Sequence, residues 1–155
     1  RLTSLRLIPD DPQAHLQALQ AIEEAEWITM GPGSWFSSVI PHLLVPEQRR
    51  ALASSRAKKI LLLNLDIADK SAGEYAGYSS IEHLEILHQY APDLHFDVVI
   101  ADQSSLGQQE LRSHLSTQGS ELLVADLRDD RELLHHDVKK LGSLFAHIER
   151  EILVG

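Results

Sequence analysis

The sequence contains no cysteine, which excludes disulfide bonds and thiolate chemistry. It also lacks any apolar run that approaches the ~20 residues of a membrane-spanning helix. Positive charge is scarce, because 14 Lys and Arg residues stand against 23 Asp and Glu, for a formal net charge of −9. This acidity argues against a nucleic-acid or anionic-membrane surface, although a turn of backbone N–H groups can bind a small anion within an acidic protein.

No signal peptide, repeat, low-complexity segment or domain linker is visible. The 155 residues, 43% of them hydrophobic, can bury one core, so we expect a single domain over residues 1–155. A cytoplasmic location is the default expectation. Because the chain opens at Arg1 and not at Met, we also expect its true start to be missing.

Short apolar runs alternate with segments of helical periodicity. Strands are predicted at residues 27–30, 60–63, 98–101 and 122–125, with a weaker one at 5–8. The run at 60–63 is apolar on successive residues, as in a strand covered on both faces. Alternating strands and helices imply a mostly parallel sheet with right-handed crossovers. We therefore predict a three-layer, Rossmann-like α/β sandwich with helices on both faces.

Capping residues and prolines predict where the helices begin. They are predicted at Asp11-Pro12, Ser34 and Pro46, and at capping-box patterns that begin at Ser79, Ser105 and Asp129. The last pattern leads into a long helix, in which apolar residues recur at steps of four and three from Leu134 to Ile152. We expect this helix to cover the sheet; a homodimer seam is the alternative.

The segment of residues 28–41 organises the chain. Its strand breaks at Gly31-Pro32-Gly33, and Ser34 then caps a short predicted helix, with Ser38 adding a hydroxyl nearby. A strand, a glycine turn and a helix start together aim backbone N–H groups at an anion. The full Gly-x-Gly-x-x-Gly motif and the P-loop lysine are absent, so the spacing alone fits a phosphate site and a plain connection equally well.

Ligands of parallel sheets bind at the carboxyl ends of the strands. The residues that follow the predicted strands are the turn at 31–34, Asn64 to Asp66, Asp102 and Asp126. We expect these groups to meet at one edge of the sheet, where Asp66 and Asp102 could hold Mg²⁺ if a metal is used. No metal site is predicted from the nine histidines, because none of them forms a recognisable ligand motif.

A family resemblance begins at the glycine turn. Residues 31–45 read Gly-Pro-Gly-Ser, an aromatic pair, Ser-Ser, Val-Ile-Pro, one residue and Leu-Leu-Val. This block resembles the gluconeogenesis factor family of bacteria, whose superfamily includes 2-phospho-L-lactate transferase, an enzyme of coenzyme F420 assembly. Supporting matches are the strand that ends at Asn64, the pair Gly73-Glu74 and the pair His83-Leu84.

Two features depart from the family pattern. The usual Thr-Gln-Pro before Gly-Glu is absent, since residues 66–72 read Asp-Ile-Ala-Asp-Lys-Ser-Ala, and Tyr75 replaces the usual Thr. The chain also lacks the family's earlier Gly-Gly-Gly-Thr-Gly turn. The resemblance therefore implies that the chain is the C-terminal part of a longer nucleotide-binding protein, whose N-terminal half is its partner.

The resemblance implies a regulator of carbon metabolism, cell-wall synthesis and cell shape that binds a nucleotide sugar such as UDP-N-acetylglucosamine. One alternative is a transferase that passes a phospholactyl group from a nucleotide-activated donor to a deazaflavin, with Mg²⁺ as its expected metal. A non-catalytic interaction module is the second alternative. The ligand-binding residues that the match implies are Gly31, Pro32, Gly33, Ser34, Ser38, His42, Asn64, Gly73, Glu74 and His83.

Overall fold

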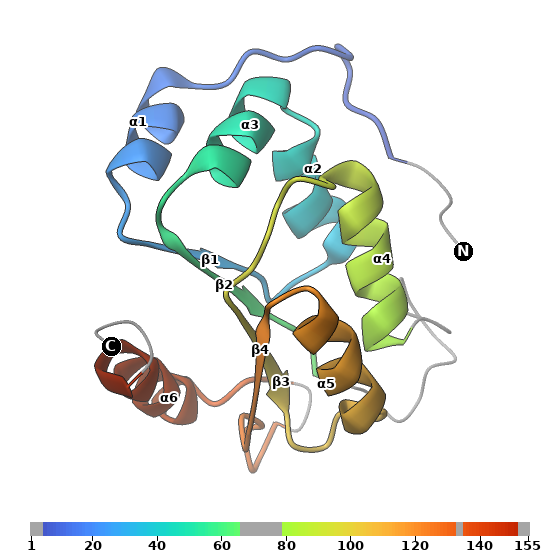
Figure 1. Cartoon of the computed structure of the whole chain (residues 1–155), viewed down its shortest axis with the longest axis vertical. Helices are drawn as coiled ribbons and strands as arrows, with labels where there is room; N and C mark the ends of the chain where they lie inside the picture. The colour runs from blue at the N-terminus through green and yellow to red at the C-terminus, as the bar shows by residue number, and fades with distance from the viewer. Residues whose placement is uncertain (1–4, 66–78, 133–134, 152–155) are drawn as a thin grey trace.

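The computed structural model describes residues 5–65, 79–132 and 135–151 (Figure 1). Its elements, in chain order, are α1 (Leu16–Glu24), β1 (Trp27–Met30), the π-helix η1 (Trp35–Val39), α2 (Ile40–Leu43), α3 (Pro46–Ser54), β2 (Lys58–Leu62), α4 (Ser80–Tyr90), β3 (Val98–Asp102), α5 (Gln108–Thr117), β4 (Glu121–Ala125) and α6 (Val138–Glu151). Within these ranges, no helix has the length and apolar character needed to cross a membrane.

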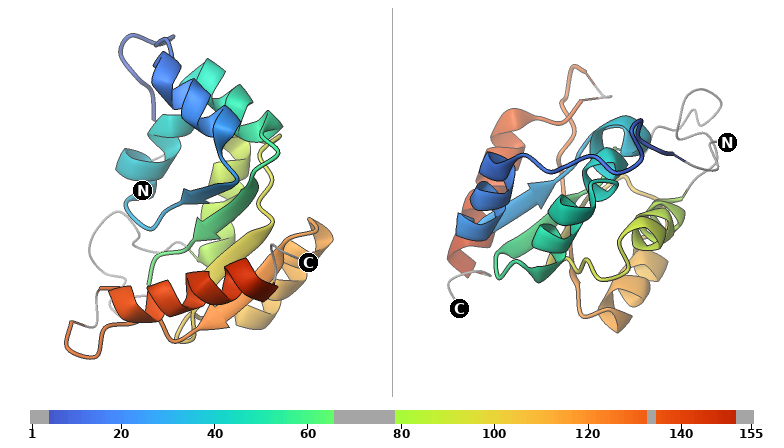
Figure 2. Two further views of the ribbon diagram at one scale, coloured as in Figure 1. Left: turned by 90° about the vertical axis from the view of Figure 1, so that its left-hand side faces the viewer. Right: turned by 90° about the horizontal axis from the view of Figure 1, so that it is seen from above.

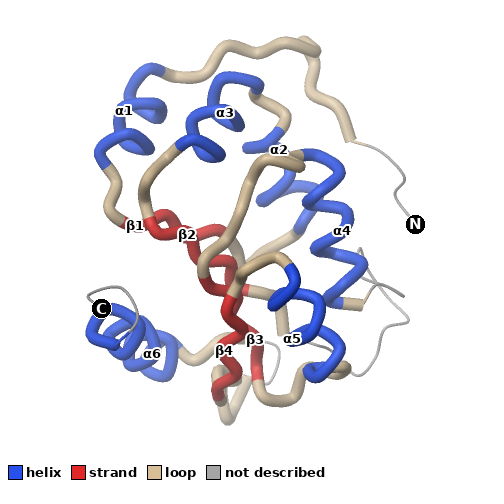
Figure 3. The backbone as a smooth tube through the Cα atoms, viewed as in Figure 1, coloured by secondary structure: helices blue, strands red, loops and turns tan. Residues whose placement is uncertain are grey.

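The four strands form one sheet in the order β1-β2-β3-β4, and every neighbouring pair is parallel. Figure 3 shows these strands in red, with the helices in blue around them. Thr29 lies opposite Ile60, and Val99 lies opposite Leu61 on one side and Leu122 on the other. The predicted parallel α/β sheet, with these four strands as neighbours, is thus confirmed. Since all four strands run the same way, their carboxyl ends lie along one edge.

Helices cover both faces of the sheet (Figure 2). The helices that connect successive strands lie on one face, as right-handed crossovers between adjacent strands require, and Leu52, Leu84 and Leu111 bury that face with Leu61 and Val99. On the opposite face lies α6. The fully buried side chain of Ile148 contacts a second cluster there that includes Ile60 and Ile100. The predicted three-layer arrangement is confirmed.

The N-terminal segment differs from the sequence prediction. Residues 5–8 form no strand, and the backbone N–H of Leu5 donates to the hydroxyl of Tyr90 at 3.0 Å. The first helix begins at Leu16 and not at Pro12, because the His15 side chain caps it by accepting from the N–H of Gln17 at 3.3 Å. The prediction of a cap at Asp11 was wrong by four residues, since neither Asp11 nor Pro12 is helical.

The predicted capping boxes have different outcomes. The box at Ser79 is confirmed: its hydroxyl accepts from the N–H of Glu82, and the Glu82 carboxylate accepts from the N–H of Ser79. The predicted cap at Ser105 is wrong. There the N–H of Ser105 closes a turn onto the carbonyl of Asp102, and α5 begins two residues further on, after Gly107 with φ +69°.

The long C-terminal helix starts later than predicted. The Asp129 carboxylate accepts from the N–H groups of Arg131 and Glu132, as a helix cap does, but Arg128 then pairs with His136 in an antiparallel bridge. It is Asp137 that caps α6, accepting from the N–H groups of Lys139 and Lys140. Leu134 and Ile152 lie outside the described residues. The sheet-cover interpretation is confirmed, since Leu141, Leu144, Phe145 and Ile148 pack on the sheet.

Candidate ligand-binding site at the carboxyl edge of the sheet

The turn after β1 is held against the neighbouring strand. Gly31 has φ +78°, and a Cβ placed on it would lie 2.4 Å from the carbonyl oxygen of Leu62. A side chain at position 31 would therefore force β1 and β2 apart at their carboxyl ends. The turn leads directly into η1, whose predicted cap is confirmed, since the Ser34 hydroxyl accepts from the N–H of Ser37 at 3.1 Å.

Asn64 clamps this turn from the end of β2. Its side-chain Oδ1 accepts from the backbone N–H of Gly33 at 2.8 Å, and its Nδ2 donates to the Gly33 carbonyl at 2.9 Å. Both arms of the Asn64 amide are therefore used to fix the turn, so the structure gives this residue a positioning role. The Gly33 N–H, which the spacing predicted to face an anion, is bonded to Asn64.

Three of the predicted ligand residues share one groove. Gly31, Ser38 and His42 line it together with Ile22 and Ile28, and its volume is about 340 Å³. The Ser38 and His42 side chains are exposed, and Nδ1 of His42 contacts the Gln48 side-chain amide at 3.0 Å. A serine hydroxyl and a histidine ring beside a glycine backbone can donate hydrogen bonds to phosphate or sugar oxygens.

His83 approaches the same segment from α4. Its ring stacks on the indole of Trp35 with centroids 5.2 Å apart and planes 5° from parallel, and both residues are buried. The contact joins the first turn of α4 to η1, so His83 helps to fix the segment that follows the glycine turn. Gly73, Glu74 and Asp66, which the sequence analysis also selected, lie outside the described residues.

Asp102 ends β3 as a buried carboxylate. Its Oδ2 accepts from the N–H of Leu127 at 2.8 Å, and its Oδ1 accepts from the N–H of Ser104 at 2.9 Å and from the Ser104 hydroxyl. Burial acts to raise the pKa of Asp102, but these hydrogen bonds and the nearby Arg128 charge outweigh it and lower the pKa. Because both oxygens are already bonded, Asp102 serves as a clamp between β3 and the segment after β4. In the described residues, no three acidic or histidine side chains gather as a metal site would require.

Sequence reasoning missed two groups at this edge. Arg128 donates from Nη2 to the Ser104 hydroxyl at 2.8 Å, and its Nε lies 3.9 Å from Oδ1 of Asp102. His136 is half-buried beside it; burial lowers the pKa of His136, and the charge of Asp102 opposes that effect. The prediction of a long helix after Asp129 hid His136, since it carried this residue away from the strand ends.

Lys140 reaches the same end of the sheet from α6. Its ammonium donates to Asp130 and Asp126 at 2.9 Å each and to the carbonyl of Arg128 at 2.8 Å. The hydrogen bonds to Asp130 and Asp126 raise the pKa of Lys140 above its ordinary value. The Lys140 ammonium therefore donates three hydrogen bonds to the loop after β4. Arg128, by contrast, lies beside Ser104 and Asp102 at the strand ends.

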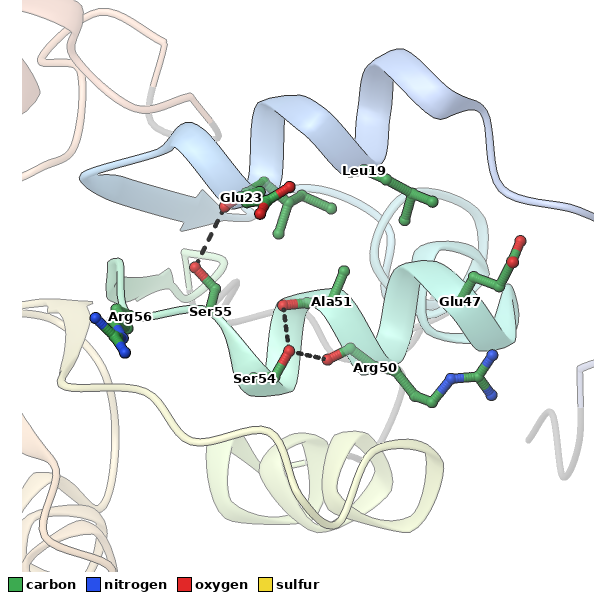
Figure 4. Close-up of a pocket in the computed structure, with 9 residues that line it drawn as sticks. Leu19, Glu23, Glu47, Arg50, Ala51, Ser54, Ser55 and Arg56 are labelled. Atoms are coloured by element: carbon green, nitrogen blue, oxygen red, sulfur yellow. Dashed lines mark hydrogen bonds between the residues drawn. The ribbon is translucent and has the colours of Figure 1, made fainter.

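A larger groove lies elsewhere, between α1 and α3 (Figure 4). Its volume is about 710 Å³, and Glu23 and Ser55 line it shortly before β1 and β2 begin. Figure 4 shows Arg50 and Arg56 at opposite ends of this groove, so the two guanidinium groups do not converge on one ligand. The groove lacks the carboxyl-end position at which parallel sheets bind ligands.

Fold and site together define an α/β protein with a parallel sheet and a structured glycine turn at the carboxyl edge of that sheet. Residues 1–141 match the family model described as 2-phospho-L-lactate transferase CofD. The chain belongs to this family. A relative named "Putative gluconeogenesis factor" from Mycobacterium tuberculosis (strain CDC 1551 / Oshkosh) is 38% identical over 156 residues, which cover 98% of this chain and 45% of the relative.

A relative of the same name from Aquifex aeolicus (strain VF5) is 27% identical and is covered over 43% of its length. The chain thus spans a little less than half the length of these curated relatives. A crystal structure of a UPF0052 family member from Bacillus halodurans superposes with a TM-score of 0.69 at 21% identity, over 91% of this chain and 49% of the other. That likeness confirms the fold, and the resemblance that the glycine turn suggested is confirmed by the family match.

Proposed function

We propose that the chain forms part of a nucleotide-sugar-binding regulator of carbon metabolism and cell-wall synthesis, with UDP-N-acetylglucosamine as the model ligand. The observation that carries the proposal is the pre-built turn at the carboxyl end of β1. Gly31 allows the close approach to β2, Asn64 fixes Gly33, and Ser38 and His42 line the adjoining groove. A rigid turn of this kind binds without first having to be ordered, which favours affinity.

The length of the edge fits an extended ligand. Gly31 and Arg128 follow the two outer strands of a four-stranded sheet, so three inter-strand spacings, roughly 14 Å, separate the strand ends that carry them. A nucleoside diphosphate sugar is long enough to cover this distance. In our proposal its phosphates meet Ser38 and His42, and its far end approaches Ser104 and Arg128.

Phospholactyl transfer is the second candidate, because the matched family model carries the name of that transferase. Transfer of a phosphate-linked group needs stabilisation of developing charge, commonly by a metal. Among the described residues, no three acidic or histidine side chains gather as a metal site would require, and the Asp102 oxygens already accept three hydrogen bonds within the chain. We therefore rank the regulator above the transferase.

Calorimetric titration of UDP-N-acetylglucosamine tests the proposal. The wild-type chain is compared with Ser38→Ala and, as a matched control, Ser113→Ala, which changes an exposed serine on α5. Loss of one neutral hydrogen bond costs about 0.5–1.5 kcal/mol, so Ser38→Ala should weaken binding roughly three- to tenfold. The control should bind as the wild type does.

The transferase candidate makes a different prediction. Incubation with a nucleotide-activated phospholactate, a deazaflavin acceptor and Mg²⁺ should then yield the phospholactylated product. Saturable binding of the nucleotide sugar without product supports the regulator. Metal-dependent product formation, with no saturable binding of the nucleotide sugar, would reverse the ranking.

A further inference from the structure

Gln48 and His42 contact each other beside the glycine turn. The side-chain nitrogen Nε2 of Gln48 lies 3.0 Å from Nδ1 of the His42 ring, and both residues line the 340 Å³ groove together with Gly31 and Ser38. A primary amide nitrogen carries two hydrogens and accepts no hydrogen bond. In this arrangement Nδ1 of His42 is therefore the acceptor, and the proton of the neutral ring lies on Nε2.

The backbone of His42 is fixed by two buried neighbours. Helix α2 begins at Ile40 and ends at Leu43, and both of these side chains are almost fully buried. His42 lies between them in the sequence, and its own side chain is exposed. Among the described residues, Gln48 is the hydrogen-bond partner of the ring. The buried neighbours thus hold the helix, and Gln48 orients the ring.

The first turn of α3, which carries Gln48, is anchored on two other sides. The Glu47 carboxylate accepts from the backbone N–H of Ala14 at 3.1 Å, and Arg49 donates from Nη1 to the carbonyl of Tyr90 at 3.1 Å. Successive residues of a helix point in different directions, so Gln48 faces a third way, toward α2. Because both flanking residues are tied down, the Gln48 carboxamide is held in place before any ligand binds.

We propose that Gln48 is a positioning residue for ligand binding, which holds His42 in the tautomer that carries its proton on Nε2. This inference rests on the proposed function, because it assigns the contact that His42 makes with the nucleotide sugar. Nε2 lies on the side of the ring away from Gln48 and is left to donate outward. A ring held in this tautomer fits an oxygen that only accepts, such as a phosphate oxygen of the ligand's diphosphate.

The reversed carboxamide is the competing arrangement. Turned by half a rotation, Gln48 would present Oε1 to the ring, and the ring proton would then lie on Nδ1. Nε2 of His42 would become an acceptor, and it would repel a phosphate oxygen. The position of the ring proton therefore separates the two arrangements.

Nitrogen chemical shifts of the histidine rings report that position without any ligand, so failure of this test is distinct from failure of the proposed function. Spectra of the ¹⁵N-labelled chain are recorded at about pH 8.5, where histidine rings are ordinarily neutral, and His42→Phe identifies the His42 signals. We expect the proton on Nε2 in the wild type and on Nδ1 in Gln48→Glu, because a carboxylate only accepts. A wild-type proton on Nδ1, or an unchanged ring in Gln48→Glu, would overturn the proposal.

Titration with UDP-N-acetylglucosamine at the same pH measures the consequence for binding. Gln48→Glu should bind roughly tenfold more weakly than the wild type, because the reversed ring loses one hydrogen bond and repels the phosphate. Gln48→Met removes the amide without placing an acceptor at Nδ1, so it should lose less. Equal losses in the two variants would contradict control of the tautomer by Gln48.

A double-mutant cycle separates the tautomer from the charge that glutamate adds. In the His42→Phe background Gln48→Glu keeps its charge and has no ring to reverse, so it should weaken binding by no more than about threefold. The same factor in both backgrounds would show that the charge alone acts, which would contradict the positioning role. An absence of binding by the wild type would overturn the proposed function and this ligand contact with it, while the ring spectra still decide the pairing of Gln48 with His42.

Discussion

At the scale of single residues, the carboxyl edge of the sheet depends on side chains that position backbone and not on side chains that reach outward. Asn64 holds both polar groups of Gly33, and Asp102 holds the N–H groups of Ser104 and Leu127. Each therefore joins two strand ends. Both residues lie where β2 and β3 end, but Gly33 and Leu127, which they hold, come from distant parts of the chain.

Asn64→Ala should destabilise the chain through the turn. It leaves the N–H and carbonyl of Gly33 without their partner, and the loss of such hydrogen bonds costs about 1–3 kcal/mol. Urea unfolding measures the change, with Ser37→Ala, an exposed serine on the same segment, as the control expected within about 0.5 kcal/mol. Equal stability of Asn64→Ala and the wild type would show that the clamp contributes nothing.

Gly33→Val is a poor probe of ligand approach. Gly33 has φ +137°, and a Cβ there would lie 3.3 Å from the Cβ of Ser38. A valine would therefore strain the turn itself and would not simply project toward a ligand. Lower thermal stability of Gly33→Val than of the wild type, even without ligand, is the expected result. An unchanged melting temperature would show that the turn tolerates the side chain.

The Asp102 carboxylate should also give the stability a pH dependence. Its pKa is lowered in the folded chain relative to an unfolded value of about 3.9, so its contribution is full above about pH 4 and is lost as the pH falls through the lowered pKa. Asp102→Asn should be less stable than the wild type by roughly 1–3 kcal/mol at pH 7. The gap should narrow toward pH 3 in urea unfolding, and a gap that stays constant would contradict the assignment.

At the scale of elements, sequence patterns predicted the helix caps that residues close together in the chain form. The Ser79–Glu82 box and the Ser34 cap each join groups three residues apart, and both form. Asp129 also accepts the hydrogen bonds that its pattern promises, yet residues 130–132 are not helical, and Arg128 pairs with His136. The cap therefore marks a turn. Only contacts between distant residues decide whether a helix continues from it.

The fold could be predicted because hydrophobic periodicity and the length of apolar runs are local properties of the sequence. Much of the site could not be predicted, because its contacts join distant residues. The Asn64–Gly33 clamp spans 31 residues and the Arg128–Ser104 contact spans 24. Nothing in the spacing around either residue indicates its partner. Parallel strand ends predicted that Asn64 and Asp102 lie at one edge, but they did not predict that both side chains are occupied there.

The contact between α6 and the sheet gives a sharp mutational contrast. Ile148 is fully buried against the sheet, while Val138, on the same helix, is 82% exposed. Ile148→Glu should unfold the domain, because an unpaired buried charge costs several kcal/mol, and Val138→Glu should be neutral within about 0.5 kcal/mol. Circular dichroism and size-exclusion chromatography measure both. A folded Ile148→Glu monomer would instead indicate a dimer seam.

At the scale of the whole molecule, two grooves meet at α1. Ser38 and His42 line the smaller groove beside the Gly31 turn, and α1 contributes Ala18, Ala21 and Ile22 to it. The larger groove, between α1 and α3, shares Ile22 with the smaller one. The chain that carries both grooves spans less than half the length of its relatives.

The most direct measurement of the central claim is a titration of the isotopically labelled chain with UDP-N-acetylglucosamine, followed through backbone amide resonances. The account predicts saturable shifts at Gly31, Ser38 and His42, with the amides of residues 50–56 unaffected. Shifts confined to residues 50–56 would place the ligand in the groove between α1 and α3. That result, or no saturable shift at Gly31 to His42, would contradict binding at the carboxyl edge of the sheet.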